Sequence, residues 1–276
     1  MNYFYCESYI SFNHAVTIHN VSIITPNENI IEACKLLGIN FVKSRRFSSI
    51  EFLKKKSLVL SETKSISRMI KKNDEFHFSH SQYSIFCFIL LNKLVKNNIK
   101  CTFHSIELLY EKSKFNLSIN YLKSFFYSIL LNYKYGNIFQ VCNYNNYQYT
   151  YRLNFKFFKS LKLIKYDKKE LEKKFINFLN KTKLNLPKLV GITFIDQGID
   201  NYSLFDEVEI DKLKKFFYSK NINIKAHPIH KTYFNSIKIN FLAEFIPFEM
   251  YLKNTTGYVI SSYSNSLIFA SRFKNI

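Results

Sequence analysis

The sequence is poor in the residues that usually interrupt or cross-link a chain. Its 276 residues include 5 glycines and 4 prolines, so each one says more about turns than usual. The 5 cysteines are widely spaced and include no Cys-x-x-Cys pair, which argues against a zinc site and a disulfide framework. We therefore expect buried free thiols, as in a protein of a reducing cytosol.

The sequence also lacks a recognisable export or membrane segment. The amino terminus has no basic stretch followed by a long apolar run, and the most apolar segment, residues 83–91, is too short to span a bilayer. We therefore expect a cytoplasmic protein. Glycine-rich phosphate loops, dinucleotide fingerprints and the usual metal motifs are absent as well. We accordingly expect neither a metal nor a bound cofactor.

Acidic residues are scarce relative to basic ones. The chain has 20 Asp and Glu against 40 Lys and Arg, which gives a net charge of +20. Such a field favours anionic partners, namely nucleic acid, acidic lipid, nucleotide sugars or acidic glycans. Residues 152–188 alone carry 12 basic residues against three acids, and residues 43–72 are also basic. Either a solvated surface or contact with an anionic membrane explains these segments.

What the chain does contain is an alternation of strand-like and helical patterns. In the first half we expect strands at residues 3–6, 21–25, 39–42, 75–78 and 99–106, with helices at 27–37, 49–71, 82–95 and 118–131. Residues 143–151, which are rich in Asn and Tyr, are expected to be irregular. The alternation predicts an α/β fold with a parallel sheet.

The second half begins the alternation again. We expect strands at residues 189–195, 222–226 and 258–261, with helices at 168–181, 206–220, 247–252 and 267–273. This predicts two lobes, residues 1–165 and 166–276. Polar residues follow the second-lobe strands, and ligands of open parallel sheets bind beyond the carboxyl ends of strands. The pattern therefore predicts a ligand cleft at that edge.

One chemically suggestive pair is His227-Pro228, at the end of the expected strand 222–226. Proline cannot continue a central strand, so it ends the strand and places the preceding side chain at the sheet edge. A histidine there can exchange protons near neutral pH. The alternative is a histidine with a purely structural role at the strand end.

A second feature is Glu249, two residues after Pro247 and in the first turn of the expected helix 247–252. A carboxylate there can accept hydrogen bonds from a ribose diol, as acids do in dinucleotide sites. The alternative is an ordinary acid that interacts favourably with the helix dipole.

A third feature is a turn with four serines in six residues, between the expected strand 258–261 and the last helix. Hydroxyl groups and free backbone N–H groups at such a turn favour a phosphate. Simple helix capping would need only one of the serines. The hydroxyls that we expect to contact a nucleotide belong to Ser262, Ser264 and Ser266.

The order of the three features resembles the carboxyl-terminal lobe of bacterial sialyltransferases and polysialyltransferases, over roughly residues 189–271. The resemblance implies a GT-B architecture, with two Rossmann-like lobes whose parallel sheets face a central cleft. It implies that His227 acts on the leaving phosphate, with Pro228 beside the nucleotide, that Glu249 holds the ribose, and that the serine turn binds the phosphate. The absence of Asp-x-Asp fits a metal-independent enzyme rather than the metal-chelating architecture.

The same families carry two acids followed by glycine, which supply the general base, and here the match is incomplete. Glu111 is followed by Lys112 and Ser113, where an acid and a glycine are expected. Asp196 is followed by Gln197 and a glycine, and it lies 31 residues before the histidine. Both acids remain candidates for the base, and a surface or loop position is the alternative for each.

The resemblance implies an inverting transferase that moves sialic acid from CMP-sialic acid to a cell-surface glycan such as lipooligosaccharide or capsular polysaccharide. The expected partners are this donor, a glycan or glycolipid acceptor and, at the inner face of the inner membrane, anionic lipid. A different donor (CMP-Kdo, or a UDP- or CDP-linked compound), a homologue without turnover, and a basic nucleic-acid-binding protein remain as alternatives. Nucleic acid is not the expected partner, because no binding motif for it appears.

The other histidines give weaker indications. His77 and His80 follow or end an expected strand, and we expect them to line the acceptor side of the cleft. His104 lies inside an expected strand, where a structural role is typical.

Overall fold

A computed structural model of the protein contains two compact units. The described residues are 1–47, 51, 54–79, 85–105, 139–143, 148–152, 161–165, 168–182, 184–196, 207–226, 234, 240–243, 245–261 and 270–271. One unit comprises residues 1–27 and 39–171, and the other comprises residues 28–38 and 172–276. The boundary predicted after residue 165 lies just before helix α7 (Lys168–Lys181), whereas this division falls inside that helix.

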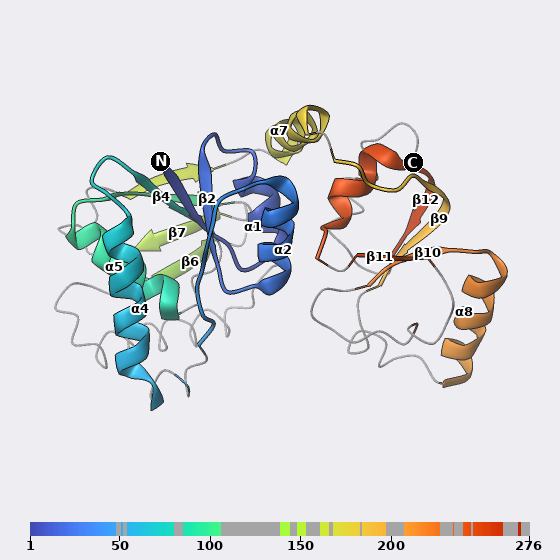
Figure 1. Cartoon of the computed structure of the whole chain (residues 1–276), viewed down its shortest axis with the longest axis horizontal. Helices are drawn as coiled ribbons and strands as arrows, with labels where there is room; N and C mark the ends of the chain where they lie inside the picture. Colours follow the sequence, from blue (N-terminus) through green and yellow to red (C-terminus); the bar gives the residue numbers. More distant parts are fainter. Residues whose placement is uncertain are drawn as a thin grey trace. The chain divides into compact units, whose positions relative to one another are not determined.

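The first unit is built on a six-stranded sheet in which every neighbouring pair is parallel (Figure 1). In sheet order the strands are β3 (Phe41–Lys43), β2 (Val21–Thr25), β1 (Asn2–Tyr5), β4 (Glu75–Phe78), β5 (Lys100–Ser105) and β8 (Leu161–Lys165). The described helices that lie between these strands in the chain are α1 (Tyr9–Ala15), α2 (Glu28–Leu37), α4 (Lys56–Met69) and α5 (Ile85–Lys96). Of these, α2 belongs to the second unit in the division given above. The predicted α/β class with parallel sheets is confirmed.

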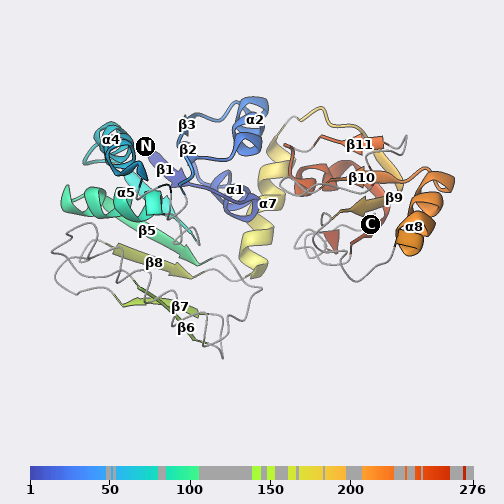
Figure 2. The same cartoon turned by 90° about the horizontal axis from the view of Figure 1, so that it is seen from below.

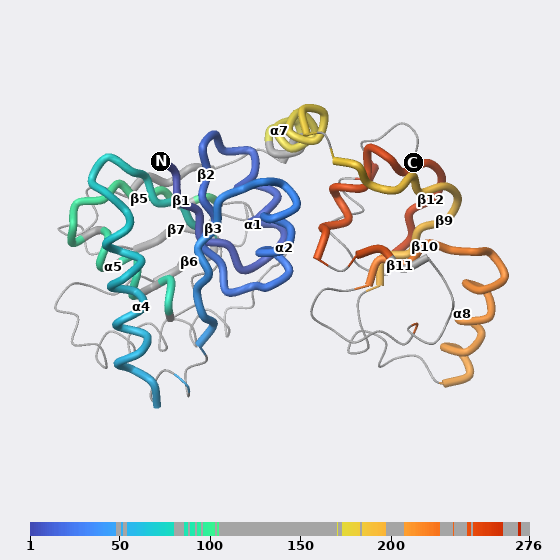
Figure 3. Tube along the Cα trace, viewed as in Figure 1, coloured from blue at the N-terminus to red at the C-terminus, as the bar shows by residue number. Residues whose placement is uncertain are grey.

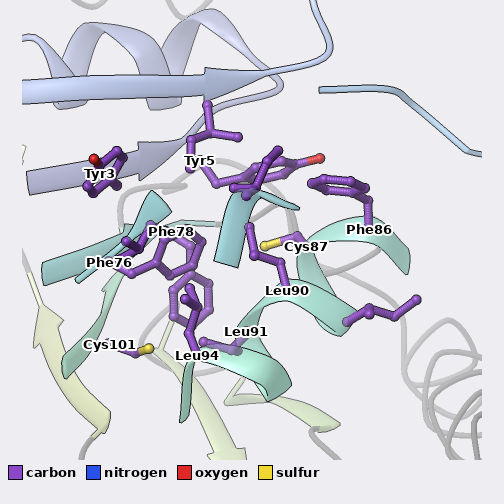
Figure 4. Close-up of a cluster of buried hydrophobic side chains, with 14 of the residues drawn as sticks. Tyr3, Tyr5, Phe76, Phe78, Phe86, Cys87, Leu90, Leu91, Leu94 and Cys101 are labelled. Carbon is purple, nitrogen blue, oxygen red and sulfur yellow. The ribbon is translucent and has the colours of Figure 1, made fainter. Parts of the chain in front are cut away.

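The two faces of this sheet carry different side chains. Helices α4 and α5 lie on one face and α1 on the other (Figures 1 and 2). On the α4–α5 face, aromatic residues of alternate strand positions pack against helix side chains (Figure 4). Among them, Tyr5 stacks on Phe86 with ring centroids 6.1 Å apart, and Phe76 stacks on Phe78. This apolar layer is the main core of the unit.

Local sequence explains where the helices begin and end. The Ser8 hydroxyl accepts a hydrogen bond from the Ser11 backbone N–H, which caps α1. Helix α2 ends at Gly38, whose φ of +64° is a conformation that glycine adopts without steric cost. The buried residues of α2 recur at helical spacing.

The second unit is a four-stranded parallel sheet in the order β11 (Asn240–Leu242), β10 (Asn223–Lys225), β9 (Leu189–Ile195) and β12 (Thr255–Ile260). Helix α8 (Glu207–Ser219) packs on one face through Phe217, which contacts Phe194. The trace in Figure 3 runs from β9 out to β10 and β11 and then returns to β12 on the other side of β9.

Several expectations from the sequence are corrected by the structure. Residues 148–151 are not irregular: β7 (Gln148–Arg152) pairs antiparallel with β6 (Phe139–Asn143). Tyr149, Thr150 and Tyr151 form the middle of this strand, and both residue types favour extended backbone. The expected α-helix 247–252 is the 3-10 helix η3 (Phe248–Asn254). Strands β6, β8 and β11 were not predicted. The expected helix 118–131 lies outside the described residues, as does the expected helix 267–273 apart from residues 270–271.

The expectation of buried thiols is confirmed for four cysteines. Those at positions 6, 34, 87 and 101 are buried and free. Burial raises the pKa of Cys34 and that of Cys101 to about 12, so both remain thiols at neutral pH. These side chains therefore contribute to packing rather than to chemistry.

Candidate functional site

The second sheet has a topological switch point between β9 and β12. The chain proceeds from β9 to β10 and β11 on one side, and then continues at β12 on the other side. Polar residues follow both switch-point strands: Asp196 follows β9 and Ser261 follows β12. The Ser261 hydroxyl donates a hydrogen bond to the Ile195 carbonyl at 2.9 Å, which joins the two strand ends. Ligands of open α/β sheets bind at such a point.

Asp196 is held rigidly at this edge. Its side chain is 0% exposed, and its backbone N–H donates to the Lys225 carbonyl at 2.9 Å. It is therefore not a surface acid. A base that removes a proton must come within hydrogen-bond distance of it. The role of Asp196 as the catalytic base stays a prediction.

Strand β10 ends at the same edge. Its last residue, Lys225, pairs in register with Ile195 of β9, so the His-Pro pair that follows Ala226 continues from a strand end beside Asp196. Lys225 is 3% exposed, and its ammonium group donates to the Ala226 carbonyl at 3.2 Å. Sequence reasoning missed this buried lysine, although a lysine inside an otherwise apolar strand was a visible signal.

Most of the predicted site residues lie outside the described part of the chain. These are His227, Pro228, Glu111, Ser262, Ser264 and Ser266. Their roles stay predictions. What the structure supplies is the location of the described strands that lead into them: β10 and β12 flank β9 and end at one edge of the sheet.

Glu249 lies in η3, in the connection from β11 to β12. This connection leaves β11 at the carboxyl edge of the sheet and enters β12 at the amino edge, at Thr255. Glu249 is in the first turn of η3, before the chain reaches the amino edge. The Glu249 side chain is 5% exposed. A solvated acid that merely interacts with a helix dipole would be exposed, so burial argues against that alternative. Contact with a ribose stays a prediction.

The first sheet has its own switch point, between β1 and β4. The chain goes from β1 to β2 and β3 on one side before it reaches β4 on the other. Serines that follow the two strands meet there. Ser11, in the first turn of α1, and Ser79, directly after β4, share a buried hydrogen bond of 2.6 Å, and the Ser8 hydroxyl lies 3.1 Å from that of Ser11. Glu7 follows β1 at the same place. Sequence reasoning missed this group, although polar residues directly after an apolar strand were the available signal.

The prediction that His77 lines an acceptor site is wrong. Its ring points into the α1 side of the sheet, where it is 6% exposed and bonds His104 at 2.8 Å. His104 in turn bonds His14 of α1 at 3.0 Å, and the Phe4 ring packs against all three imidazoles. The structural role expected for His104 is the one observed. His80 lies outside the described residues.

The hydrogen-bond pattern determines the direction of this histidine chain. The Asn2 amide nitrogen donates to the His19 carbonyl, so the Asn2 oxygen faces Nε2 of His77 at 3.1 Å and accepts its proton. Nδ1 of neutral His77 must then accept from Nε2 of His104, and Nδ1 of His104 from Nε2 of His14. In the neutral form of His77 the proton is therefore on Nε2, and the Nε2 atoms of His104 and His14 are the donors of this chain. Burial lowers the pKa of His77 to about 4.

No described group of His, Cys, Asp or Glu side chains is arranged to hold a metal ion. The three histidines bond one another instead of converging on a common point. Over the same described residues, no helix is both long and apolar enough to cross a membrane.

Comparison with known proteins gives only distant structural likeness. No protein-family model matches the sequence, and no curated protein matches it. Among solved structures, the chain is similar to the calicheamicin glycosyltransferase CalG4 (9% identity, TM-score 0.43) and to the spinosyn rhamnosyltransferase SpnG complexed with thymidine diphosphate (10% identity, TM-score 0.44). These alignments cover 98% and 99% of this chain and 77% and 78% of the other chains.

A third similar structure is a glycosyltransferase from Rickettsia africae, with 14% identity and a TM-score of 0.37 over 98% of this chain and 69% of the other. At these identities and TM-scores the likeness assigns no activity to this chain. The functional argument therefore rests on the chain's own residues.

Proposed function

We propose that the protein is an inverting, metal-independent glycosyltransferase that takes its sugar from a nucleotide-sugar donor held by the second unit. The observation that carries the proposal is the convergence of strand ends at the second switch point. The strands that lead into the His-Pro pair and the serine turn both flank β9, which ends directly before Asp196. The His-Pro pair, Asp196 and the serine turn thus follow the neighbouring strands β10, β9 and β12 at one edge, where α/β sheets bind nucleotides.

The proposed chemistry assigns one task to each feature. Ser262, Ser264 and Ser266 hydrogen-bond the donor phosphate, and Glu249 hydrogen-bonds the ribose. His227 gives a proton or a hydrogen bond to the phosphate oxygen that leaves the sugar. A positioned acid of this kind contributes about 10²–10⁴-fold to turnover. Hydrogen-bond donors aimed at the leaving phosphate add electrostatic stabilisation of the transition state.

We propose CMP-sialic acid as the donor and a cell-surface glycan, such as lipooligosaccharide or capsular polysaccharide, as the acceptor. The support is the order of His-Pro, Pro-x-Glu and the serine turn, which resembles that of bacterial sialyltransferases. The second candidate is the same architecture with a CMP-Kdo or UDP-sugar donor, because the geometry of the strand ends does not depend on which nucleobase the donor carries.

A thermal-shift panel of CMP, CDP, UMP, UDP and GDP tests the donor class. We expect selective stabilisation by CMP, because a ligand that binds only the native state raises apparent stability: about 2.7 kcal/mol at a hundredfold excess over Kd. The matched variant His227→Ala should keep the CMP-dependent shift and lose about 10²–10⁴-fold in transfer from CMP-sialic acid. Stabilisation by UDP instead would replace the donor, and indifference to every nucleotide would refute the proposed function.

A further inference from the structure

Strand β10 ends on a lysine to which the sequence motifs assign no role. All three residues of this inner strand are buried, and Lys225 is only 3% exposed. Lysine is rarely buried to this extent, because removing an ammonium group from water costs much free energy. A residue that breaks the apolar pattern of an inner strand in this way commonly has a functional reason.

The side chains of β10 alternate between the two faces of the second sheet. Ile224 belongs to the apolar cluster that includes Phe217 of α8, so it faces that helix. Asn223 and Lys225 therefore lie on the other face. The Asn223 side-chain amide donates to the Val190 carbonyl at 3.3 Å, which joins β10 to β9. The contact of Lys225 is of a different kind, because it lies at the strand end.

The Lys225 ammonium group holds the peptide group that leads into the His-Pro pair. It donates to the Ala226 carbonyl at 3.2 Å. That carbonyl belongs to the peptide group that joins Ala226 to His227. Hydrogen bonds from a charged donor are stronger than those between neutral groups. Because a peptide group is planar, a bond that fixes its carbonyl also fixes the direction in which the chain enters His227.

The preceding peptide group is held as well. The Asp196 backbone N–H donates to the Lys225 carbonyl at 2.9 Å, and Ala226 is buried. Both peptide groups before His227 are therefore fixed by hydrogen bonds at the carboxyl edge of the sheet. A side chain that acts on a reacting atom must keep its direction within about 10–20°, which requires support of this kind.

We propose that Lys225 is a positioning residue for His227: its ammonium group holds the Ala226–His227 peptide group so that the imidazole meets the phosphate oxygen that leaves the sugar. This inference rests on the proposed function and concerns the second unit alone. Lys225 stays protonated throughout and acts through the peptide group. The proton or hydrogen bond that the leaving oxygen receives comes from His227.

The test compares Lys225→Met with the control Asn223→Ala, a change on the same strand and the same face. Methionine keeps most of the apolar stem of lysine but removes the charge and the donor. We expect Lys225→Met to lower kcat for transfer on the order of 10²-fold, because a displacement of about 1 Å at a reacting group costs that much. The donor KM and the CMP-dependent thermal shift should stay unchanged. Asn223→Ala should lower the midpoint of urea unfolding and retain wild-type kcat.

A double variant separates positioning of His227 from a purely structural role. In a His227→Ala background there is no imidazole to position, so Lys225→Met should lower kcat no further. A residue that only maintains the fold, or that contacts the donor itself, lowers kcat by the same factor in both backgrounds. The proposal is overturned by near-wild-type kcat in Lys225→Met, by an equal loss of kcat in Asn223→Ala, or by losses that multiply in the double variant. If Lys225→Met does not fold, Lys225→Gln is measured by the same criteria.

The outcomes distinguish this proposal from the one it rests on. If the wild-type protein transfers sugar and Lys225→Met does so equally well, only the role of Lys225 fails. If the wild-type protein neither binds a nucleotide nor transfers sugar from any donor, the proposed function fails, and the role of Lys225 fails with it.

Discussion

At the scale of single residues, the buried histidine chain makes the stability of the first unit depend on pH. His77 lies between Asn2 and His104, and the charged groups nearest to it are Glu75 and Lys100, which form an ion pair. Burial is the main cause of the low pKa of His77, which is about 4. The negative charge of Glu75 raises this pKa, and the positive charge of Lys100 lowers it. Protonation of His77 would turn a second N–H donor toward Nε2 of His104, so the chain would keep its hydrogen bonds only if the tautomers of His104 and His14 changed.

We predict that stability falls as the pH is lowered from about 6.5 to about 4. In this window the unfolded chain binds a proton at His77 and the folded chain does not, so acid favours unfolding. Above pH 6.5 the contribution is fully present. The slope from this one group reaches about 1.4 kcal/mol per pH unit. Urea unfolding at several pH values measures it.

The control for this prediction is a second histidine. His77→Gln should flatten the pH dependence between pH 4 and 6.5, while His19→Gln, at an exposed position, should leave it as in the wild type. Identical slopes for His77→Gln and the wild-type protein would show that the chain does not control the acid sensitivity.

At the scale of elements, two glycines allow β9 and β12 to pair at the second switch point. Gly191 and Gly257 are directly opposite each other in the register of the two strands. A Cβ added at Gly257 would lie 2.1 Å from the Gly191 carbonyl oxygen, and the φ of Gly257 is +121°. Both the contact and the backbone angle exclude a side chain there.

Gly257→Ala should therefore destabilise the second unit by at least about 3 kcal/mol, since it combines backbone strain with a clash between main chains. Gly38→Ala is the matched control: its φ is also positive, +64°, but nothing lies within 4 Å of the added carbon. Backbone strain alone should cost about 1–2 kcal/mol there. Chemical denaturation of both variants measures the difference, and equal losses would contradict the clash.

At the scale of the whole molecule, the charge of +20 gives the protein a long-range attraction for anionic surfaces. In the described structure, basic side chains of α4 and its flanks are exposed, and Leu58 and Met69 expose apolar surface on the same helix. The exposed bases are Lys54, Lys55, Lys56, Lys64, Arg68, Lys71 and Lys72. We propose that this basic helix contacts anionic lipid at the inner membrane face.

The prediction is salt-sensitive binding to vesicles that contain anionic lipid and none to neutral vesicles. Each base near such a surface contributes about 1 kcal/mol. The triple variant Lys56→Glu, Lys64→Glu, Arg68→Glu should weaken binding on the order of 100-fold. Reversal of three exposed lysines in or after α8 (Lys212, Lys215 and Lys220) is the control for net charge. Equal effects of the two triple variants would assign binding to overall charge instead of α4.

Local sequence determined much of the element pattern. Strands β2, β4 and β9 and helix α7 have the predicted bounds, because period-2 and period-3.6 patterns report which side chains a single element buries. The α/β class followed from the alternation of those elements. The same reasoning located the polar residues that end the second-unit strands, Asp196 among them.

The sequence did not determine strand order, the switch points or the environment of single polar groups. Nothing local says that β12 pairs with β9 instead of β11, because parallel neighbours are joined through crossovers and their pairing depends on burial of the whole sheet. For the same reason the environments of single polar residues depend on the tertiary structure. In it Asp196 is buried, His77 is hydrogen-bonded to His104, and Glu7, which follows β1, is partly exposed.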